Sequence, residues 1–369
     1  MTTSRTRTRT RLKDVAQRLD LSPALVSGVL NNRANVWASP ETRARVFEAA
    51  RELDYHPSNA AQALSRGRAN TVALVYRRLE GQHYRLAYTG LVDTLSAELQ
   101  ARAHDLVVTN FATQEEVLDH LRKLANSRAC DAVVLWGREV DTEGQGELLE
   151  SLHMPFLVKG RHEVHHPHWA QIDFDHEGMM ATAVERVVAQ GHRRLAYLGF
   201  PHDDAFVHAL RRGYIEAHER LLGHAPDPAL FGEFEDEIAP NAARIGEWLA
   251  RPEPHRPTAF VIGSGNSAWH ALEAGLAQSG RALGLGSGEV AAAGVASHSL
   301  TLMFGEAWAF GDIEIDHLAR MASPDLLDDV LAGRESRPVV RFSPELAPVS
   351  TLRLLEHGVA LVPRREAGS

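Results

Sequence analysis

The sequence predicts a small all-α head at the N-terminus, followed by an α/β core of two doubly wound parallel-sheet subdomains. Two patterns lead to this fold class. Residues 12–53 hold three short segments with apolar residues three or four positions apart, which is the period of a helix. From residue 71 onwards, short apolar runs alternate with helical segments, which is the order that builds parallel sheets.

The head is predicted to be a helix-turn-helix unit that begins with a helix over 12–19. Ser22 is a good N-cap, and Pro23 suits the first position of a second helix, 23–30, because its missing N–H has no helical partner there. The Ser-Pro pair at 39–40 repeats this signal and begins a third helix. The apolar residues expected in the core of the head are Leu12, Val15, Ala16, Leu19, Val26, Val29, Leu30, Val46, Ala49, Ala50 and Leu53.

A hinge helix is predicted within residues 57–69. The segment Asn59 to Ser65 is rich in Ala and too short to be a stable helix alone, so we expect it to fold only between DNA and a second copy of the chain. Leu64 is then a candidate wedge between base pairs. The alternative is a plain linker with one helical turn.

The core is expected to alternate strands and helices up to residue 295. The predicted strands are 71–76, 105–111, 131–136, 155–161, 171–175, 194–200, 258–263 and 289–295, and the predicted helices are 86–102, 114–126, 145–152, 176–190, 207–222, 239–250 and 266–279. Leu300 to Phe304 is expected to cross between the subdomains, 311–332 to return as a helix to the first, and 338–357 to close the second. The predicted division is 1–56 for the head, 57–69 for the hinge, 70–172 with 302–333 for the first subdomain, and 173–301 with 334–369 for the second.

The charge is distributed unevenly along the chain. Residues 1–70 hold 12 Lys and Arg and 6 Asp and Glu, a net charge of +6, whereas the rest holds 27 and 42, a net charge of −15. A basic head on an acidic body directs nucleic acid to one end of the molecule and keeps the body away from the phosphates.

Several features exclude other classes of protein. No apolar run approaches the 18 residues of a membrane span, and the N-terminus lacks the apolar region of a secretory signal. The single cysteine, Cys130, is expected in the core without a disulfide, which fits the cytoplasm. The sequence holds no P-loop, nucleophile elbow or metal motif, so an enzyme or a transport-type binding protein is disfavoured, and no cofactor is expected.

The chain resembles the lactose-repressor (LacI) family of bacterial transcription regulators. The resemblance is carried by KDVA at 13–16, Ser22 to Asn31, SPETRARV at 39–46, Tyr55 to Leu64, QGHRRLAYLG at 190–199, PTAFVI at 257–262 and Ser350-Thr351. It implies a homodimer or tetramer, a near-palindromic DNA operator, and a two-subdomain core related to periplasmic sugar-binding proteins.

Carried over residue by residue, the resemblance implies a set of DNA contacts in the head and hinge. The base-reading positions are Pro23, Ala24 and Leu25, the phosphate-contacting ones are Ser22, Ser27 and Asn31, and the minor-groove ones are Ala61 and Leu64. Arg33 and Asn59 are expected as further DNA contacts. The family usually has an arginine where this chain has Gly28, so contacts to thymine methyl groups and DNA shape are expected to carry more of the recognition. Trp37, in the loop that follows, could contact the DNA backbone or simply pack.

The resemblance also places an effector beyond the carboxyl ends of the strands, between the two subdomains. The residues expected to line this site are Arg77, His83, Tyr84, Arg161, Asp173, Phe234, Ser264, Trp269 and Ser297. Polar residues that often bind sugars in the family are replaced here, for example by Leu210, which leaves a less polar pocket. The effector is therefore expected to be a sugar derivative, another metabolite or a protein, or to be absent.

The stretch 161–176 holds five histidines, which together with carboxylates could bind zinc. Their spacing matches no closed zinc site, so a solvated loop without metal is expected.

The sequence indicates a cytoplasmic transcription regulator. It is expected to be a repressor that binds a palindromic operator, with an affinity for DNA that a small molecule modulates. The alternative is the same DNA-binding role under the control of a protein partner or of the protein's own abundance.

Overall fold

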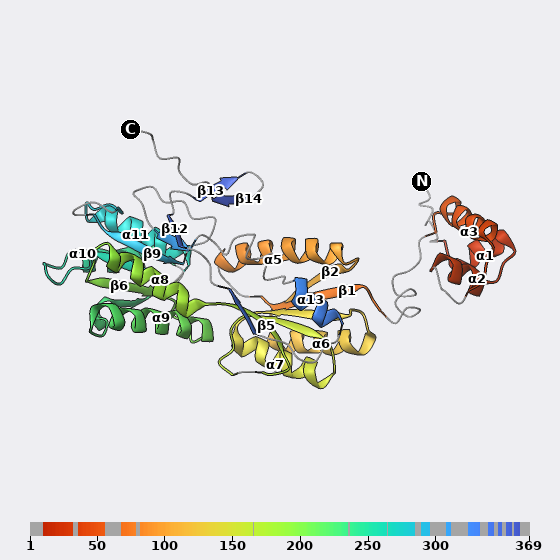
Figure 1. The fold of residues 1–369 in the computed structure, drawn as a ribbon, viewed down its shortest axis with the longest axis horizontal. Coiled ribbons are helices and arrows are strands. Elements are labelled where there is room, and N and C mark those ends of the chain that lie inside the picture. Colours follow the sequence, from red (N-terminus) through yellow and green to blue (C-terminus); the bar gives the residue numbers. More distant parts are fainter. Residues whose placement is uncertain are drawn as a thin grey trace, which may run out of the picture. The chain divides into compact units, whose positions relative to one another are not determined.

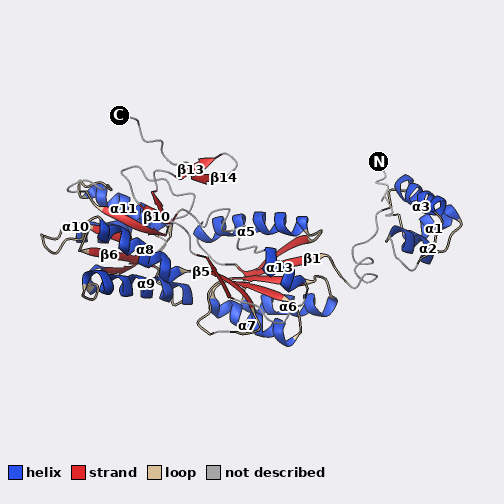
Figure 2. Ribbon diagram, in the orientation of Figure 1, coloured by secondary structure: helices blue, strands red, loops and turns tan. Residues whose placement is uncertain are grey.

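The computed structural model describes residues 10–31, 36–55, 68–78, 82–164, 166–234, 237–263, 265–284, 289–295, 308–310, 324–332, 339–342, 346–348, 352–355 and 358–361. The chain divides into two compact units, of which one is Met1–Asn70 with Ser127–Asp131 and the other is the remainder. Figure 1 traces the helical head and the α/β body, and Figure 2 shows that the head is all helix whereas sheets form the centre of the body.

The head has the three predicted helices, α1 (Leu12–Leu19), α2 (Pro23–Leu30) and α3 (Pro40–Glu52). Both predicted N-caps form, because the Ser22 hydroxyl accepts a bond from the Leu25 N–H at 3.2 Å and the Ser39 hydroxyl accepts one from Thr42 at 3.1 Å. The buried residues of this small core are all among those expected: Val15, Ala16, Val26, Val29, Val46, Ala49 and Ala50.

Gly28 leaves no room for a side chain on the buried face of α2. A Cβ atom built on Gly28 would lie 2.4 Å from Cγ2 of Val36. The arginine that the LacI family usually has at this position therefore cannot be accommodated unless the segment around Val36 moves. We expect Gly28→Ala to destabilise the head by about 1–3 kcal/mol through overpacking. Thermal unfolding followed by circular dichroism measures this, and Gly28→Ala/Val36→Ala should recover most of the loss; a double variant as unstable as the single one would contradict it.

The first sheet of the body has six parallel strands in the order β11-β5-β4-β3-β1-β2. They are β1 (Thr71–Arg77), β2 (Asp105–Phe111), β3 (Ala132–Trp136), β4 (Phe156–Lys159), β5 (Ala170–Phe174) and β11 (Val339–Phe342). The helices around this sheet are α5 (Gln82–Ala101), α6 (Gln114–Ser127), α7 (Glu139–Ser151) and α13 (Pro324–Leu331). Leu95 of α5 and Leu327 of α13 join the same core cluster as Leu74 of β1, which places both helices on one face of the sheet.

The second sheet repeats this strand order as β12-β10-β9-β8-β6-β7, with β12 antiparallel at the edge. Its strands are β6 (Leu195–Gly199), β7 (Phe231–Glu233), β8 (Ala259–Gly263), β9 (Ala291–Val295), β10 (Trp308–Phe310) and β12 (Leu346–Pro348). Its helices are α8 (His176–Ala189), α9 (Ala205–Leu222), α10 (Ile238–Leu249) and α11 (Asn266–Gln278). A short 3-10 helix, η1 (Pro228–Leu230), precedes β7, and a hairpin of β13 (Leu352–Leu355) and β14 (Gly358–Leu361) follows β12.

The predicted division of the C-terminal third needs correction. Trp308–Phe310 was expected in the first subdomain but pairs with β9 of the second sheet, and Val339–Phe342 was expected in the second but pairs with β5 of the first. α13 does lie against the first sheet, as expected, and Leu300 to Phe304 lies outside the described residues. The sheet to which a short strand belongs is decided by the neighbouring strand with which it forms hydrogen bonds, and the apolar pattern of the short strand does not encode that neighbour.

Helix α7 begins at Glu139, whereas the sequence predicts a helix only from 145. Gly144 and Gly146 argue against a helix in the sequence because glycine disfavours helix interiors. Gly146 is required by tertiary packing, since a Cβ atom there would lie 2.4 Å from Cη2 of Trp169. The earlier start of α7 places Glu143 on a rigid helix.

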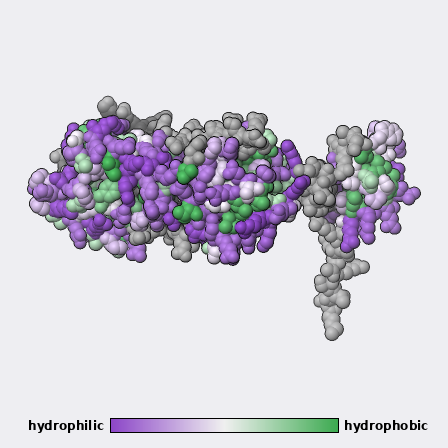
Figure 3. Space-filling view, turned by 90° about the horizontal axis from the view of Figure 1, so that it is seen from below, coloured by the Kyte–Doolittle hydropathy of each residue, from purple (hydrophilic) through white to green (hydrophobic). Residues whose placement is uncertain are grey.

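The described surface is mostly hydrophilic on the face shown in Figure 3, with hydrophobic patches among the hydrophilic residues. Cys130 is buried, with 5% of its surface exposed, as predicted. Within the described residues, none of the helices has both the length and the apolar composition to cross a bilayer.

Candidate functional site

The N-terminal end of α2 is the exposed part of the head that the sequence assigns to base reading. Pro23 and Ala24 are exposed, while Leu25 is half-buried and packs against the core of the head. Ser27 and Asn31 are half-buried and bonded to each other, because the Asn31 amide donates to the Ser27 carbonyl at 2.8 Å and to its hydroxyl at 3.3 Å. These hydrogen bonds hold the side chain of Asn31 against Ser27, one helical turn before it.

Trp37 stands out of the head, with 89% of its surface exposed. This exposure excludes the alternative in which Trp37 packs against the described part of the head. The segment that carries it is fixed on one side by Arg43, whose guanidinium donates to the carbonyl of Val36 at 3.1 Å. A large aromatic surface is therefore presented to solvent close in sequence to α2.

Several predicted site residues belong to segments that the structure does not describe. Arg33, Asn59, Ala61, Leu64, Ser264 and Ser297 lie outside the described residues, as do the side chains of His83 and Tyr84, whose backbone belongs to α5. The hinge helix predicted within 57–69 also falls largely outside them.

Each sheet of the body has a topological switch point, where the chain turns to opposite sides of the first strand. In the first sheet the switch lies between β1 and β3, and in the second between β6 and β8. Parallel α/β sheets bind ligands at such points, beyond the carboxyl ends of the strands. Arg77, the last residue of β1, lies at the first switch point. Its guanidinium donates two bonds of 2.8 Å to the two carboxylate oxygens of Asp141, which is buried, so this predicted effector residue is already paired.

At the second switch point, two predicted aromatic lining residues are core residues. Phe234 is 2% exposed and packs edge-on against Trp248. Trp269 is fully buried, and its indole N–H donates to the carbonyl of Val295 at 2.5 Å. Burial also raises the pKa of the Tyr197 phenol well above its ordinary value, so this side chain stays neutral between the glycines that end β6 and β8.

Arg161 and Asp173, the other two predicted effector residues, come together in one ion-pair network. Arg161 follows β4 and donates to both carboxylate oxygens of Glu177, on α8, at 2.8 and 2.7 Å. Its Nη1 also lies 3.9 Å from Asp173, whose side chain is 3% exposed. Arg212 of α9 donates to the same Glu177 carboxylate at 3.2 Å.

The electrostatics of this network follow from Glu177. Its partial burial by itself would raise the pKa of the carboxyl, but the positive charge of Arg161 and the bonds from Arg161 and Arg212 outweigh it. The pKa of Glu177 therefore lies below its ordinary value, and the carboxylate stays ionised at neutral pH.

A second ion pair joins the same two sets of elements. Arg138, which precedes α7, donates from Nε to both oxygens of Asp204 at 2.9 and 2.8 Å, and Asp204 is 2% exposed. Arg212 adds a longer contact of 3.4 Å to Glu163. We call the pairs Arg138–Asp204, Arg161–Glu177 and Arg212–Glu163 the junction pairs, because they connect loops that follow strands of the first sheet with α8 and α9 of the second.

Most members of the junction pairs escape sequence reasoning, which singled out only Arg161. The one signal available is that Arg161 ends a predicted strand and that Arg138 and Glu163 come two residues after one, where charged side chains meet at the same edge of a sheet. Their partners on α8 and α9 carry no such signal, because charged residues are ordinary on exposed helix faces.

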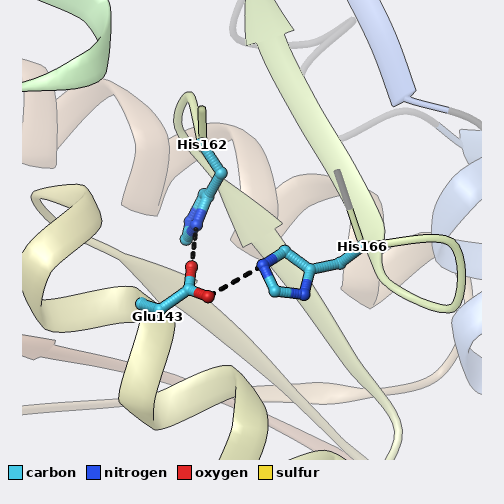
Figure 4. A group of neighbouring side chains, drawn as sticks. All are labelled: Glu143, His162 and His166. Carbon is cyan, nitrogen blue, oxygen red and sulfur yellow. Dashed lines mark hydrogen bonds and ion pairs between the residues drawn. The ribbon is translucent and has the colours of Figure 1, made fainter. Parts of the chain in front are cut away.

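The histidine-rich stretch differs from the predicted solvated loop. His162 is 7% exposed and His166 is half-buried, and both face the carboxylate of Glu143 on α7 (Figure 4). His168, by contrast, is exposed as predicted. The reason for the difference is the early start of α7, which brings a carboxylate beneath the loop.

Comparison with known proteins bears on both parts of the chain. Residues 11–58 match the model of the bacterial regulatory proteins of the lacI family, and residues 164–282 match the periplasmic binding protein-like domain. The HTH-type transcriptional regulator AglR of Rhizobium meliloti is 32% identical over 274 residues, 74% of each chain. RafR of Escherichia coli, also an HTH-type transcriptional regulator, is 30% identical over 71% of this chain and 76% of its own length.

Solved structures agree on the architecture. A transcriptional regulator CelR–cellobiose complex aligns with a TM-score of 0.59 and 25% identity, over 92% of this chain and 98% of that one. The lac repressor dimer bound to operator and an anti-inducer has the same fold, with a TM-score of 0.70, 18% identity and coverage of 93% and 98%. Given AglR, with its 32% identity over 74% of both chains, this chain belongs to the LacI family, whose members are DNA-binding transcription regulators and not enzymes.

Proposed function

We propose that the protein is a repressor that binds a palindromic operator as a homodimer in the bacterial cytoplasm. The observation that carries the proposal is the N-terminal end of α2, where Pro23 and Ala24 are exposed beside the half-buried Leu25. These side chains offer no hydrogen-bond donors to base edges, so they fit contacts with thymine methyl groups in the major groove. The basic head supplies the phosphate contacts that provide most of the affinity.

The homodimer follows from the geometry of recognition. A single α2 covers only a few base pairs, and a two-fold dimer doubles the contact while it imposes two-fold symmetry on the operator. The similarity to the lac repressor dimer on its operator supports this arrangement. The exposed Trp37 is a candidate for contact with the DNA backbone next to each half-site.

The junction pairs support control of DNA binding by a small molecule. A ligand that binds beyond the carboxyl ends of the strands would have to compete with Asp141 and Glu177 for the guanidinium groups of Arg77 and Arg161, or bridge these groups. A ligand that prefers one arrangement of the junction pairs shifts the protein towards it, and this differential affinity is the requirement for allosteric control. The CelR–cellobiose complex supports a sugar-like effector.

A second candidate function is the same repressor without a small-molecule effector. It is favoured by the internal contacts of all five predicted effector residues whose side chains are described. Arg77, Arg161 and Asp173 are engaged in ion pairs, and Phe234 and Trp269 are buried in the core. In this case a protein partner or the abundance of the repressor would set its activity.

The proposal is tested by selecting DNA from a random pool with the full-length protein. We expect the selected sequences to share a two-fold symmetric site, and a single half-site to bind at least about 100-fold more weakly, because half of the base and phosphate contacts are lost. Fluorescence anisotropy at fixed salt measures both affinities. A selected site without symmetry, bound equally well by its half, would contradict the homodimer.

The same DNA distinguishes the two candidate functions. A screen of sugars, sugar phosphates, nucleosides and organic acids is run by thermal shift, and each compound that stabilises the protein is then tested for its effect on operator affinity. A compound at a hundred times its Kd should stabilise the fold by about 2.7 kcal/mol. A stabilising compound that changes operator affinity supports the effector, whereas no such compound, with operator binding intact, supports the second candidate.

A further inference from the structure

Two histidines of the loop between β4 and β5 contact the two carboxylate oxygens of Glu143 on α7. Nδ1 of His162 lies 2.7 Å from Oε2 of Glu143, and Nε2 of His166 lies 2.9 Å from Oε1. Glu143 is held on α7, and Figure 4 shows both imidazole rings directed at its carboxylate from the loop. All three ligand atoms lie within 4.8 Å of one another.

Hydrogen bonds at both ring nitrogens fix the orientation of the His162 imidazole. The Thr142 hydroxyl donates to the carbonyl of Arg138 at 3.1 Å and lies 3.0 Å from Nε2 of His162, so it can accept a proton from that nitrogen. Nδ1 forms a hydrogen bond of 2.7 Å with Oε2 of Glu143, and a metal ion would take the place of the proton in this bond.

His166 adds an independent observation. Its Nε2 is buried and has no hydrogen bond, because its approach to Glu143 at 2.9 Å lacks hydrogen-bond geometry. The ring is nevertheless fixed, since it stacks on Trp169 at 3.7 Å between centroids with an interplanar angle of 11°. Trp169 in turn donates from Nε1 to Glu150 at 3.2 Å and also packs edge-on against His162.

We propose that Glu143, His162 and His166 bind a late first-row divalent cation such as Zn²⁺. Two imidazoles and one carboxylate are a ligand set that zinc takes in proteins, with water or a further ligand in the remaining position. Zinc–nitrogen and zinc–oxygen bonds of about 2.0–2.2 Å place the ligand atoms about 3.3 Å apart, so the two contacts need to widen only by about half an ångström.

The surroundings have the features of a supported metal site. With Nδ1 bound to a metal ion, Nε2–H of His162 would donate to the Thr142 hydroxyl 3.0 Å away, and orienting the ring is the usual role of such a group behind a metal-binding histidine. The side chains of Glu143 and His166 are 31% and 16% exposed, which leaves a route for the ion and for a water ligand. The side chain of His162 has no exposed surface, so this ligand is shielded from solvent.

The position of the site gives metal binding a structural consequence. The same loop carries Arg161 and Glu163, which form two of the junction pairs with Glu177 and Arg212. A bound ion would tie this loop to α7 and so hold Arg161 and Glu163 in place against α8 and α9.

The test is a Zn²⁺ titration of the full-length, untagged protein after treatment with a chelator. Competition with a chromophoric chelator gives the affinity, and Co²⁺ as a second probe reports ligand geometry through its visible absorption. We expect one Zn²⁺ per chain with a Kd below about 1 µM, and a loss of at least about 10-fold in Glu143→Gln, His162→Ala and His166→Ala. The intense Co²⁺ bands of a four-coordinate site should disappear in the same variants.

Two further variants complete the design. His168→Ala removes an exposed histidine of the same loop and should bind Zn²⁺ within about twofold of the unmodified protein. Thr142→Val tests the positioning of His162 and should weaken Zn²⁺ about 10-fold while the ligands remain. Circular dichroism verifies folding, and Glu143→Gln preserves shape if a histidine variant does not fold. Unchanged Zn²⁺ binding in the three ligand variants, or no binding tighter than about 100 µM in the unmodified protein, would overturn the proposal.

Discussion

Replacing Ala24 by Asp is expected to weaken operator binding by about 100-fold or more while the head remains folded. The side chain is exposed at the start of α2, so the carboxylate has room in the free protein. In the complex it would face base edges and phosphates, where it loses an apolar contact and adds charge repulsion. Stability should be unchanged or slightly higher, because a negative charge in the first turn interacts favourably with the helix dipole, and α2 has no acidic residue there.

Ala44→Asp is the matched control for this variant. It makes the same chemical change at an exposed alanine of α3, away from the end of α2 that we assign to base reading. We expect operator affinity within about fivefold of the unmodified protein, since exposed charges are screened beyond about 8 Å at physiological salt. If Ala24→Asp and Ala44→Asp lose affinity equally, the effect is only that of net charge, and α2 does not read the operator.

Replacing Arg161 by Ala is expected to cost the body about 3 kcal/mol at neutral pH. The guanidinium side chain is only 9% exposed and holds Glu177 while it lies 3.9 Å from Asp173, which is 3% exposed. Its removal leaves two carboxylates without their shared counter-charge, and uncompensated buried charge is what makes the loss of a buried pair expensive. Urea unfolding of the unmodified and variant proteins at pH 7 measures the difference.

The cost should depend on pH in a defined direction. Arg161 and Arg212 outweigh burial and hold the pKa of Glu177 below the value of 4.5 that it has in an unfolded chain. The resulting stability is fully present above pH 4.5 and is lost as the pH falls through the lower folded pKa. Without Arg161, burial is opposed by Arg212 but no longer by Arg161, so the folded pKa of Glu177 lies higher than in the unmodified protein. Glu177 then takes up a proton at a higher pH, which relieves the penalty as the pH falls. The difference between the two proteins should therefore narrow from pH 7 towards pH 4.5.

Arg220→Ala provides the control for an ion pair between the same two helices. Arg220 of α9 pairs with Glu185 of α8 at 2.8 Å, but their side chains are 56% and 50% exposed. Such an exposed pair contributes less than about 1 kcal/mol, so its loss should be small at every pH. An equal cost for Arg161→Ala and Arg220→Ala, or a cost for Arg161→Ala that does not change with pH, would contradict the assigned role of the Arg161 network.

The helices of the head could be predicted from local sequence alone. The Ser-Pro signals at 22–23 and 39–40 identify the starts of α2 and α3, and apolar spacing identifies their buried faces. These features are determined within one or two turns of helix, so they can be predicted without knowledge of the fold. The same holds for the strands of the body that are buried on both faces, such as β3 and β8, because continuous apolar runs encode them directly.

Contacts between distant segments were decided by tertiary structure. Arg161 and Asp173 could be selected because they match positions of the effector site in the LacI family, but only the packing of α8 against the second sheet brings Glu177 to Arg161. The assignments of β10 and β11 depend on which sheet offers each of them a strand to pair with. Likewise, Gly146 lies inside a helix because Trp169 occupies the space beside it.

By itself, then, the sequence determined the helical head, the two-sheet body and the class of DNA-binding regulator, because periodicity, caps and motifs are local properties of the chain. Only the tertiary structure decided that the predicted effector residues Arg77 and Arg161 are paired internally, and that Glu143, His162 and His166 converge. The physical reason is that such groups meet through packing of segments far apart in sequence, and neither the spacing nor the type of these residues specifies that packing.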